Sequence, residues 1–231
     1  MTSIPHTYPH TYPDSYFLGR GLIDSKRMES FILEKKLINE YVSSGVMCDV
    51  GCGTGEFHEI LKWKGAIFGM EISETAKVAA RHRGVDFSKS ILTEVDFFDL
   101  IVFRGVIQHL PDPFGYLASS YKSLKPGGVI VFLMTPNADS ICYKLFGQLP
   151  LLDSNRNFWT PSVSTLSANL TNLGFQINHI GKPYWRSPYR SLIADHFKFV
   201  LRVLRLRSTA GAFWGNAMEL IAQKPNPNMA R

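Results

Sequence analysis

The sequence has few cysteines and no long apolar run. Its three cysteines, Cys48, Cys52 and Cys142, favour reduced thiols over a disulfide framework, and no Cys or His cluster around them completes a zinc set. No uncharged apolar stretch approaches the roughly 18 residues that a membrane span needs. The proline-rich start, MTSIPHTYPHTYPDSY, lacks the apolar core of a secretory signal. We therefore expect a cytoplasmic protein.

An excess of positive charge is confined to one segment of the chain. The formal net charge is +6, and residues 181–210 account for all of it, because they contain many lysines and arginines but a single acid, Asp195. A protein that binds nucleic acid more often spreads its basic residues over a whole face of the fold. The charge pattern therefore argues against a nucleic-acid partner, including nucleic-acid methylation.

Apolar patterns along the chain predict strands that alternate with helices. Strands are expected at 46–50, 66–70, 85–87, 98–103, 129–134, 175–180 and 217–223. Helices are expected at 25–42, 55–63, 73–84, 112–124 and 160–174, and the segment KPGG at 125–128 separates a helix from a strand. This alternation indicates a parallel sheet covered on both faces. Ligands of such sheets bind at the carboxyl ends of the strands.

A glycine-rich segment follows the first expected strand. Residues 48–56 read CDVGCGTGE, with the spacing G-x-G-x-G in place of the G-x-G-x-x-G of dinucleotide-binding loops. Asp49 and Glu56 flank the glycines, and two carboxylates would repel a phosphate but suit a ligand with a positive end. Glu71 ends the second expected strand, where a carboxylate can accept hydrogen bonds from both hydroxyls of a ribose. A ribose, no phosphate and a cationic amino-acid end together describe S-adenosylmethionine.

Four motifs in order resemble class I S-adenosylmethionine-dependent methyltransferases, in the branch that methylates small molecules, quinols and sugars. They are DVGCGTG, Glu71, FFDLIVFRGVIQHLPDP and LKPGGVIVFLMTPN, and the resemblance covers roughly residues 16–223. It implies a Rossmann-like α/β fold with a seven-stranded, mostly parallel sheet, one antiparallel strand near the edge, and helices on both faces. It also implies a single domain over residues 1–231, with a leader and lid helix at 1–44, a cofactor-binding core at 45–140 and an acceptor-side segment at 141–231.

The resemblance also implies a cofactor site formed by the glycine loop and by the ends of the next strands. Its expected members are Asp49, Gly51, Cys52, Gly53, Thr54, Gly55, Glu71, Ile72, Ser90 and Ile91. Asp49 would anchor the ammonium end of the cofactor, Glu71 would hold the ribose, and Ile72 would lie against the adenine. The family often has an acid near the adenine amino group, where this chain has Ile91 after Ser90.

Candidate catalytic residues follow the fourth expected strand. His109 could remove the proton of a hydroxyl acceptor, or it could steady the LPDP turn that follows it. Arg104 either faces the acceptor or pairs with a surface acid. Relatives that act on quinol rings often read E-V-L-E-H where residues 105–109 read GVIQH. A divalent metal would need several oxygen ligands, so we expect no metal.

Three residues are candidates for the acceptor pocket. Tyr16 could belong to an N-terminal lid or be a surface aromatic residue on the leader. Arg156 and Trp159 could line the pocket, or they could lie in an ordinary linker after the fifth expected strand.

Residues 187–207, SPYRSLIADHFKFVLRVLRLR, predict an amphipathic helix with a basic stripe. Lys198, Arg202 and Arg205 share one face of this helix, and apolar residues cover most of the rest. Such a helix can lie in a membrane interface, which would make the protein membrane-peripheral. Alternatively, it packs on its own domain or on a second subunit in a homodimer.

These observations together predict a methyltransferase that uses S-adenosylmethionine. The expected reaction is in-line transfer of a methyl group to an oxygen of a small or lipid-linked acceptor, such as a sugar or a quinol. A nicotinamide-dependent oxidoreductase is disfavoured by the loop spacing and by the carboxylates of Asp49 and Glu56. A catalytically inactive scaffold that binds the cofactor stays open as a third class, because the general base is not settled by the sequence.

Overall fold

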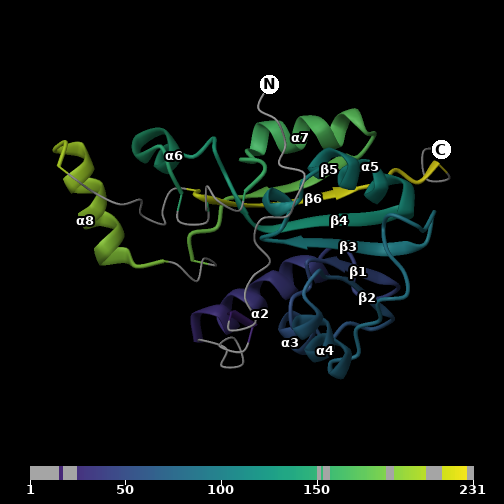
Figure 1. Ribbon diagram of the computed structural model, residues 1–231. Coiled ribbons are helices and arrows are strands. Elements are labelled where there is room, and N and C mark those ends of the chain that lie inside the picture. The colour runs from purple at the N-terminus through teal and green to yellow at the C-terminus, as the bar shows by residue number, and fades with distance from the viewer. Residues whose placement is uncertain are drawn as a thin grey trace.

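A six-stranded sheet lies at the centre of the protein (Figure 1). The computed structural model describes residues 16–17, 25–149, 152, 157–185, 190–206 and 215–227. In sheet order the strands are β2 (Ile67–Met70), β1 (Met47–Val50), β3 (Phe98–Arg104), β4 (Leu124–Pro136), β6 (Ala217–Gln223) and β5 (Gln176–Gly181). Neighbours from β2 to β4 are parallel, whereas β6 is antiparallel to β4 and to β5. The expected α/β fold with one antiparallel strand near an edge is therefore confirmed.

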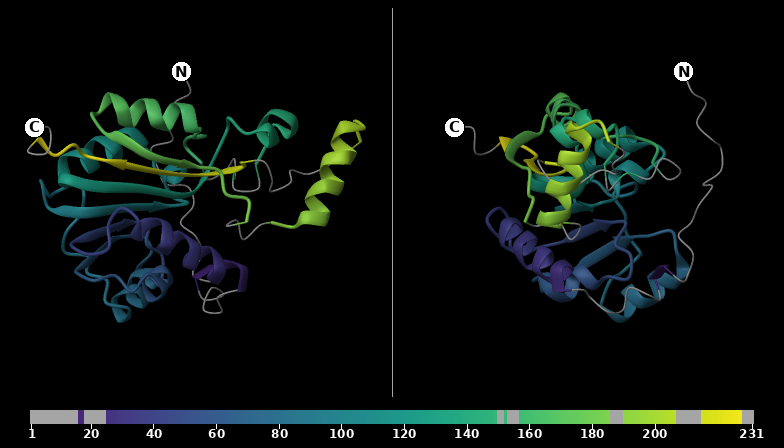
Figure 2. Two further views of the ribbon diagram at one scale, coloured as in Figure 1. Left: turned by 180° about the vertical axis from the view of Figure 1, so that it is seen from behind. Right: turned by 90° about the vertical axis from the view of Figure 1, so that its left-hand side faces the viewer.

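Helices cover both faces of the sheet, as expected. Figure 1 shows α2 (Ser25–Asn39), α3 (Glu56–Leu61) and α4 (Glu74–His82) on one face, and α5 (Pro113–Ser123) and α7 (Val163–Asn172) on the other. Two short helices, η2 (Ile107–His109) and α6 (Ile141–Phe146), follow β3 and β4. The last helix, α8 (Leu192–Val203), stands away from the sheet beyond the carboxyl end of β4, and the left view of Figure 2 agrees with this placement.

The side chains of β3 alternate between two hydrophobic cores. Leu100 and Val102 pack with residues of α2 and α3 in one core, and Ile101 and Phe103 pack with residues of α5 and α7 in the other. All four side chains are fully buried. Because successive residues of a strand point to opposite faces, a strand between two layers of helices must be apolar at every position. This requirement explains the near-continuous apolar run at 98–103 that predicted β3, in which Asp99 is the exception.

The prediction of a strand at 85–87, and with it a seven-stranded sheet, was wrong. In the described part of the chain this segment forms only an isolated bridge between Phe68 and Asp86. The backbone N–H of Ser88 donates to Asp86 Oδ1 at 2.8 Å. This contact turns the chain away from β2 after one pairing, as aspartate side chains commonly do in turns.

The start of β4 also differs from the prediction. The strand begins at Leu124 and includes the KPGG segment that was expected to lie before it. Phe98 pairs with Leu124 and Leu100 pairs with Val129, so β4 carries more residues than β3 between the two pairings. The extra residues form a bulge, which lets a strand accommodate a proline and two glycines near its start.

Helix starts follow local capping chemistry. Ser73 accepts a hydrogen bond from Ala76 N at the start of α4, and Asp112 accepts one from Gly115 N at the start of α5, as predicted. The expected start of α7 at Thr160-Pro161 was wrong. Its N-cap is Ser162, because Ser162 and Thr165 form a reciprocal capping box.

Candidate cofactor and acceptor site

The glycine loop leaves β1 and enters α3 with its three glycines in left-handed conformations. The φ angles are 73° at Gly51, 55° at Gly53 and 78° at Gly55, in a region that other residues rarely adopt. A Cβ atom added at Gly51 would lie 2.5 Å from Val106 Cγ2, whereas one added at Gly53 would meet nothing within 4 Å. The backbone at Gly53 therefore borders open space that a ligand can approach closely.

Glu71 lies against this loop at the end of β2. Its Oε2 accepts a hydrogen bond from Gly53 N at 2.9 Å, and its Oε1 accepts from Ile72 N at 2.8 Å and Ser73 N at 3.0 Å. These bonds hold the carboxylate in place beside the glycine loop. Since a carboxylate offers about four lone-pair positions, Glu71 can still accept from a ligand hydroxyl.

The three residues expected near the adenine differ in how exposed their side chains are. The side chain of Ile72 is 55% exposed, so an apolar surface next to Glu71 is open to a flat ring. Ser90 is partly buried. Ile91 is only 1% exposed and belongs to the hydrophobic core that also contains residues of α5 and α7, so its side chain lies in the core and at most its backbone faces a ligand. A contact of Ser90 or Ile91 with the cofactor stays a prediction.

Asp49 is buried at the base of the loop and has a partner that the sequence did not indicate. It is 3% exposed, and its Oδ2 lies 3.2 Å from Nε2 of His58, a buried residue of α3. The other oxygen, Oδ1, is buried without a hydrogen-bond partner. A buried acceptor without a partner is costly unless a ligand supplies a donor. The position of His58, in the short helix directly after the loop, is the signal that could have found it.

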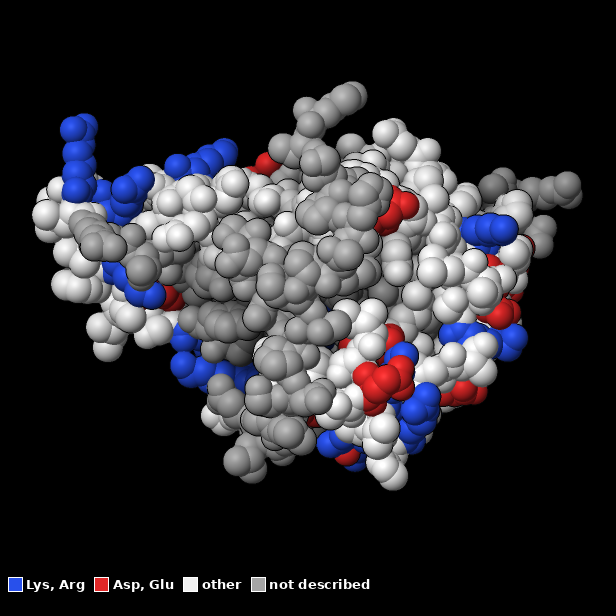
Figure 3. Space-filling model, viewed as in Figure 1, with Lys and Arg blue, Asp and Glu red and all other residues white. Residues whose placement is uncertain are grey.

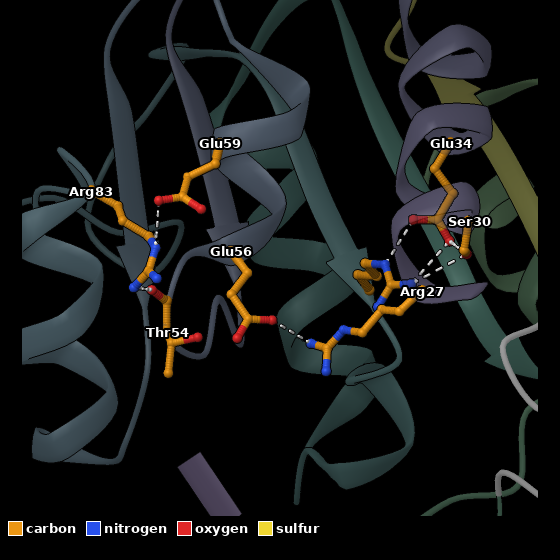
Figure 4. A network of polar contacts seen from close by, with 8 residues as sticks. Arg27, Ser30, Glu34, Thr54, Glu56, Glu59 and Arg83 are labelled. Atoms are coloured by element: carbon orange, nitrogen blue, oxygen red, sulfur yellow. Dashed lines mark hydrogen bonds and ion pairs between the residues drawn. The ribbon is translucent and has the colours of Figure 1, made fainter. Parts of the chain in front are cut away.

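Ion pairs anchor the loop to the surrounding helices (Figure 4). Glu56, the first residue of α3, lies 3.1 Å from Arg27 Nη2 of α2, so its carboxylate is neutralised from a segment far away in the sequence. Arg83 donates to Thr54 O at 3.1 Å and to Glu59 Oε1 at 3.0 Å. Burial raises the pKa values of the Cys48 and Cys52 thiols, so both stay protonated beside the loop.

Arg104 is held by a buried acid rather than by a surface one. Its Nε donates to Glu34 Oε2 at 2.7 Å, and its guanidinium lies over the ring of Phe31 with 4.5 Å to the centroid. The side chain of Glu34 is fully buried, and Ser30 also contacts this pair (Figure 4). The Arg104 side chain is thus held by residues of α2, and its contact with an acceptor stays a prediction.

His109 ends η2, where its ring is positioned by Gln108. The amide nitrogen of Gln108 donates to Gly105 O at 3.0 Å and lies 3.2 Å from His109 Nε2. Because a carbonyl oxygen can only accept, the amide group of Gln108 must present its NH₂ side to both atoms. His109 Nε2 then accepts a hydrogen bond, which assigns the proton of the neutral ring to Nδ1.

The segment around Trp159 covers this part of the site. Phe158 N and Trp159 N both donate to Gln108 O, at 2.9 and 3.4 Å, and the Trp159 ring packs on Phe114. Both amide atoms of Asn157 and Oε1 of Gln108 are buried without hydrogen-bond partners. These unpaired polar groups were missed by the sequence reasoning, because nothing in the order of residues shows which polar atoms are left over.

The structure gives less information on the two other candidates for the acceptor pocket. Tyr16 is partly buried and its ring meets Phe17 edge-on, so a place in a lid stays a prediction. Arg156 lies outside the described residues.

Known proteins share both the sequence pattern and the fold. Residues 26–180, more than half of the chain, match a family model described as a methyltransferase domain. Ubiquinone biosynthesis O-methyltransferase of Psychrobacter arcticus is 27% identical over 59% of this chain and 64% of its own length. The protein of the same name from Thiobacillus denitrificans is 33% identical over 42% of this chain and 47% of its own length.

A solved structure has the same fold. The crystal structure of a SAM-dependent methyltransferase from Archaeoglobus fulgidus superimposes with a TM-score of 0.64 and 20% identity, covering 90% of this chain and 99% of that chain. At this identity the likeness shows the fold alone. The match of the family model to residues 26–180 shows that the chain belongs to the family of methyltransferase-domain proteins.

Proposed function

We propose that this protein transfers a methyl group from S-adenosylmethionine to a hydroxyl oxygen of a small or lipid-linked acceptor, such as a quinol or a sugar. The two O-methyltransferases described above support this reaction class, although the matched segments span 64% and 47% of their lengths. The proposal therefore depends on whether the residues of this chain suit the cofactor and the chemistry.

The residues at the glycine loop fit the cofactor. The observation that carries the proposal is the buried Oδ1 of Asp49, which has no hydrogen-bond partner and belongs to the residue expected to receive an ammonium group. Open space borders Gly53, and Glu71 is held beside it with oxygens that can accept from ribose hydroxyls. The carboxylates of Asp49 and Glu71 beside the loop also disfavour a dinucleotide, because like charges repel phosphates.

For this reaction the protein mainly has to position the acceptor and remove the proton of its hydroxyl group. S-adenosylmethionine supplies a methyl group on a sulfonium, which is a good leaving group, so the C–S bond breaks as the C–O bond forms and sulfur keeps the electron pair. Orientation of the acceptor can contribute about 7–11 kcal/mol. His109 Nε2, which accepts a hydrogen bond from the Gln108 amide in this structure, would take the proton from the acceptor hydroxyl. The acceptor hydroxyl would replace the Gln108 amide as the partner of Nε2.

Polar groups near η2 support a polar, oxygen-bearing acceptor. The amide of Asn157 and Oε1 of Gln108 are buried and unpaired, and Phe158 N ties their two segments together. A bound acceptor with hydroxyl or carbonyl groups would satisfy them, whereas a purely apolar one would leave them without partners. The exposed apolar side chains of α8 beyond the carboxyl end of β4 support the lipid-linked form of this acceptor.

The cofactor is tested by calorimetric titration with S-adenosylhomocysteine. We expect binding in the micromolar range and a loss of about tenfold or more for Glu71→Ala, because hydrogen bonds to a charged group contribute roughly 1.5–3 kcal/mol. Glu74→Ala is the matched control, since Glu74 is a neighbouring acid with a side chain that is 74% exposed. Binding of NADH without binding of S-adenosylhomocysteine would refute the proposal in favour of an oxidoreductase.

Turnover separates an enzyme from an inactive scaffold. With radiolabelled methyl donor and a panel of quinols, catechols and sugars, we expect label in at least one hydroxyl-bearing acceptor. Tight binding of S-adenosylhomocysteine with no label in any acceptor of the panel would favour the scaffold.

A further inference from the structure

The helix α8 turns its apolar side chains to the solvent. They are Leu192, Ile193, Phe197, Val200 and Val203 of the helix and Leu204 directly after it, which together are called the α8 face. Ile193 is 88% exposed, and Phe197 and Leu204 are each 63% exposed. These exposures contradict the alternative that the helix packs its apolar side on its own domain. Contiguous exposed apolar surface of this kind usually marks an interaction site.

Polar contacts hold α8 in this orientation. Asp195, the one buried residue of the helix, accepts hydrogen bonds from Tyr184 Oη and Ser191 N, both at 3.0 Å. Burial raises the pKa of Tyr184 to about 12, so its hydroxyl remains a donor at neutral pH. Asp195 and Ile193 are two residues apart, about 200° around a helix, so an anchor at Asp195 directs Ile193 outward.

Three further contacts fix the two ends of the segment that contains α8. Arg190 pairs with Glu29 of α2, and Lys26 Nζ donates to Arg190 O at 3.1 Å. Near the other end, Arg202 Nε donates to Leu145 O of α6 at 2.7 Å. The helix is therefore attached to the body through polar groups on both sides, and its apolar face needs another partner.

A second copy of this chain is a poor partner for the α8 face. A helix of 12 residues is about 18 Å long and about 10 Å wide, so one face can bury only a few hundred Å². A stable dimer buries about 800 Å² on each partner. Two copies would also bring together the lysine and arginines of α8 and the adjoining residues, and Asp195, the acid of that segment, is buried at its anchor.

The charge around α8 suits an anionic bilayer. Lys198 lies on the helix and Arg205 follows it, and Figure 3 shows lysine and arginine side chains gathered at the end of the molecule where α8 stands. Lysine and arginine next to an apolar helix face can reach lipid headgroups while the apolar side chains enter the interface. No helix in the described ranges is both long enough and apolar enough to cross a bilayer, so α8 would lie on its surface.

We propose that the α8 face docks the protein on an anionic lipid membrane, with Ile193 and Phe197 in the interface and Lys198 and Arg205 on the headgroups. The face lies beyond the carboxyl end of β4, next to the end of the sheet where the site is built (Figure 1). If the proposed methyl transfer is correct, docking here would bring an acceptor with a lipid tail to the mouth of that site. The docking itself does not require the reaction.

Vesicle sedimentation tests the proposal with the full chain. We expect the protein to sediment with vesicles of phosphatidylcholine and phosphatidylglycerol at low salt, and to stay in the supernatant at high salt or with phosphatidylcholine alone. Lys198→Gln/Arg205→Gln should weaken the partition roughly 30-fold, or about fivefold per charge. Ile193→Ser/Phe197→Ser should weaken it at least as much, since both side chains would leave the apolar interface.

Controls separate this proposal from the others. Val78→Ser/Val95→Ser removes two other exposed apolar side chains, 52% and 55% exposed, from another surface, and it should leave vesicle binding unchanged. Every variant should keep its affinity for S-adenosylhomocysteine, so loss of docking is distinguishable from loss of the proposed function. Absence of the wild-type protein from the anionic vesicle pellet would overturn the proposal, as would a dimer in solution that Ile193→Ser/Phe197→Ser converts to monomer.

Discussion

At the scale of single residues, the buried pair of Asp49 and His58 connects the stability of the protein to its cofactor. Asp49 lies at the end of β1, and His58 is its partner from the first turns of α3. One carboxylate oxygen faces His58 and the other has no partner. The pair therefore holds the carboxylate in place while leaving one acceptor position unfilled.

Removal of His58 should destabilise the free protein more than the liganded one. In His58→Ala the Asp49 carboxylate would be buried with no partner, and we expect a loss of about 1–3 kcal/mol in the free energy of unfolding. Saturating S-adenosylhomocysteine should recover part of this loss, because its ammonium group would pair with Asp49. Urea unfolding without ligand measures the loss of stability, and urea unfolding with ligand measures how much of that loss is recovered.

The control for this prediction is His82→Ala, which removes an exposed histidine at the end of α4. An equal loss of stability for His58→Ala with and without ligand would show that the ligand does not reach Asp49.

His109 is the residue on which proton transfer is expected to depend. In His109→Ala we expect kcat to fall about 100-fold or more, with little change in affinity for S-adenosylhomocysteine. The loss should be largest for the least acidic acceptor hydroxyls, because these need a base most. Turnover of such an acceptor at the wild-type rate would instead assign His109 to the structure of the turn at η2.

At the scale of elements, α2 is tied to both sides of the candidate site. Arg27 reaches Glu56 directly after the glycine loop, and Glu34 receives Arg104 at the end of β3. The helix was expected to be part of a lid. In the structure its polar contacts connect the cofactor loop to β3, the strand that precedes η2. A shift of α2 would therefore displace both the loop and the end of β3.

Arg104→Met distinguishes the structural role of Arg104 from an acceptor role. The substitution would leave the Glu34 carboxylate fully buried without its cation, and we expect the free energy of unfolding to fall by about 3 kcal/mol. Denaturant unfolding is the measurement, with Lys122→Met on the exposed side of α5 as the control. A large fall in kcat at unchanged stability would show instead that Arg104 acts on the acceptor.

At the scale of the whole molecule, all three cysteines are buried and none is in a disulfide. Burial raises the pKa values of Cys48 and Cys52, and the nearby Asp49 carboxylate adds to both shifts. Since only the thiolate reacts readily, these thiols are protected by both inaccessibility and charge state. Their reactivity therefore reports opening of the sheet and its helices.

We expect the folded protein to react slowly with Ellman's reagent near neutral pH, and all three thiols to react at once in denaturant. The rate in native buffer should follow the rate or extent of opening measured by denaturant unfolding. Bound S-adenosylhomocysteine should slow it further, because a ligand that binds only the folded state lowers the population of open forms. A fast phase of one thiol in the folded protein would contradict this expectation. The assignment of residues 1–231 to a single domain stays a proposal that such cooperative behaviour would support.

Several features of this protein depend on neighbours along the chain and could be predicted without the fold. The apolar run of β3, the caps at Ser73 and Asp112, and the left-handed glycines of the loop are set by residues within a few positions of one another. The order of motifs also sufficed to predict the α/β fold and the family, because each motif ends a strand at the same edge of the sheet.

Groups that are distant in the sequence become partners through the packing of helices on the sheet. Arg104 could have met an acceptor or a surface acid, and the packing of α2 on β3 gave it the buried Glu34. Likewise, α8 could have packed on the core, and the anchor at Asp195 turned its apolar face outward. The physical reason is that a charge or an apolar face is stabilised by whichever group the fold brings into contact with it. The order of residues does not show which distant groups will be in contact.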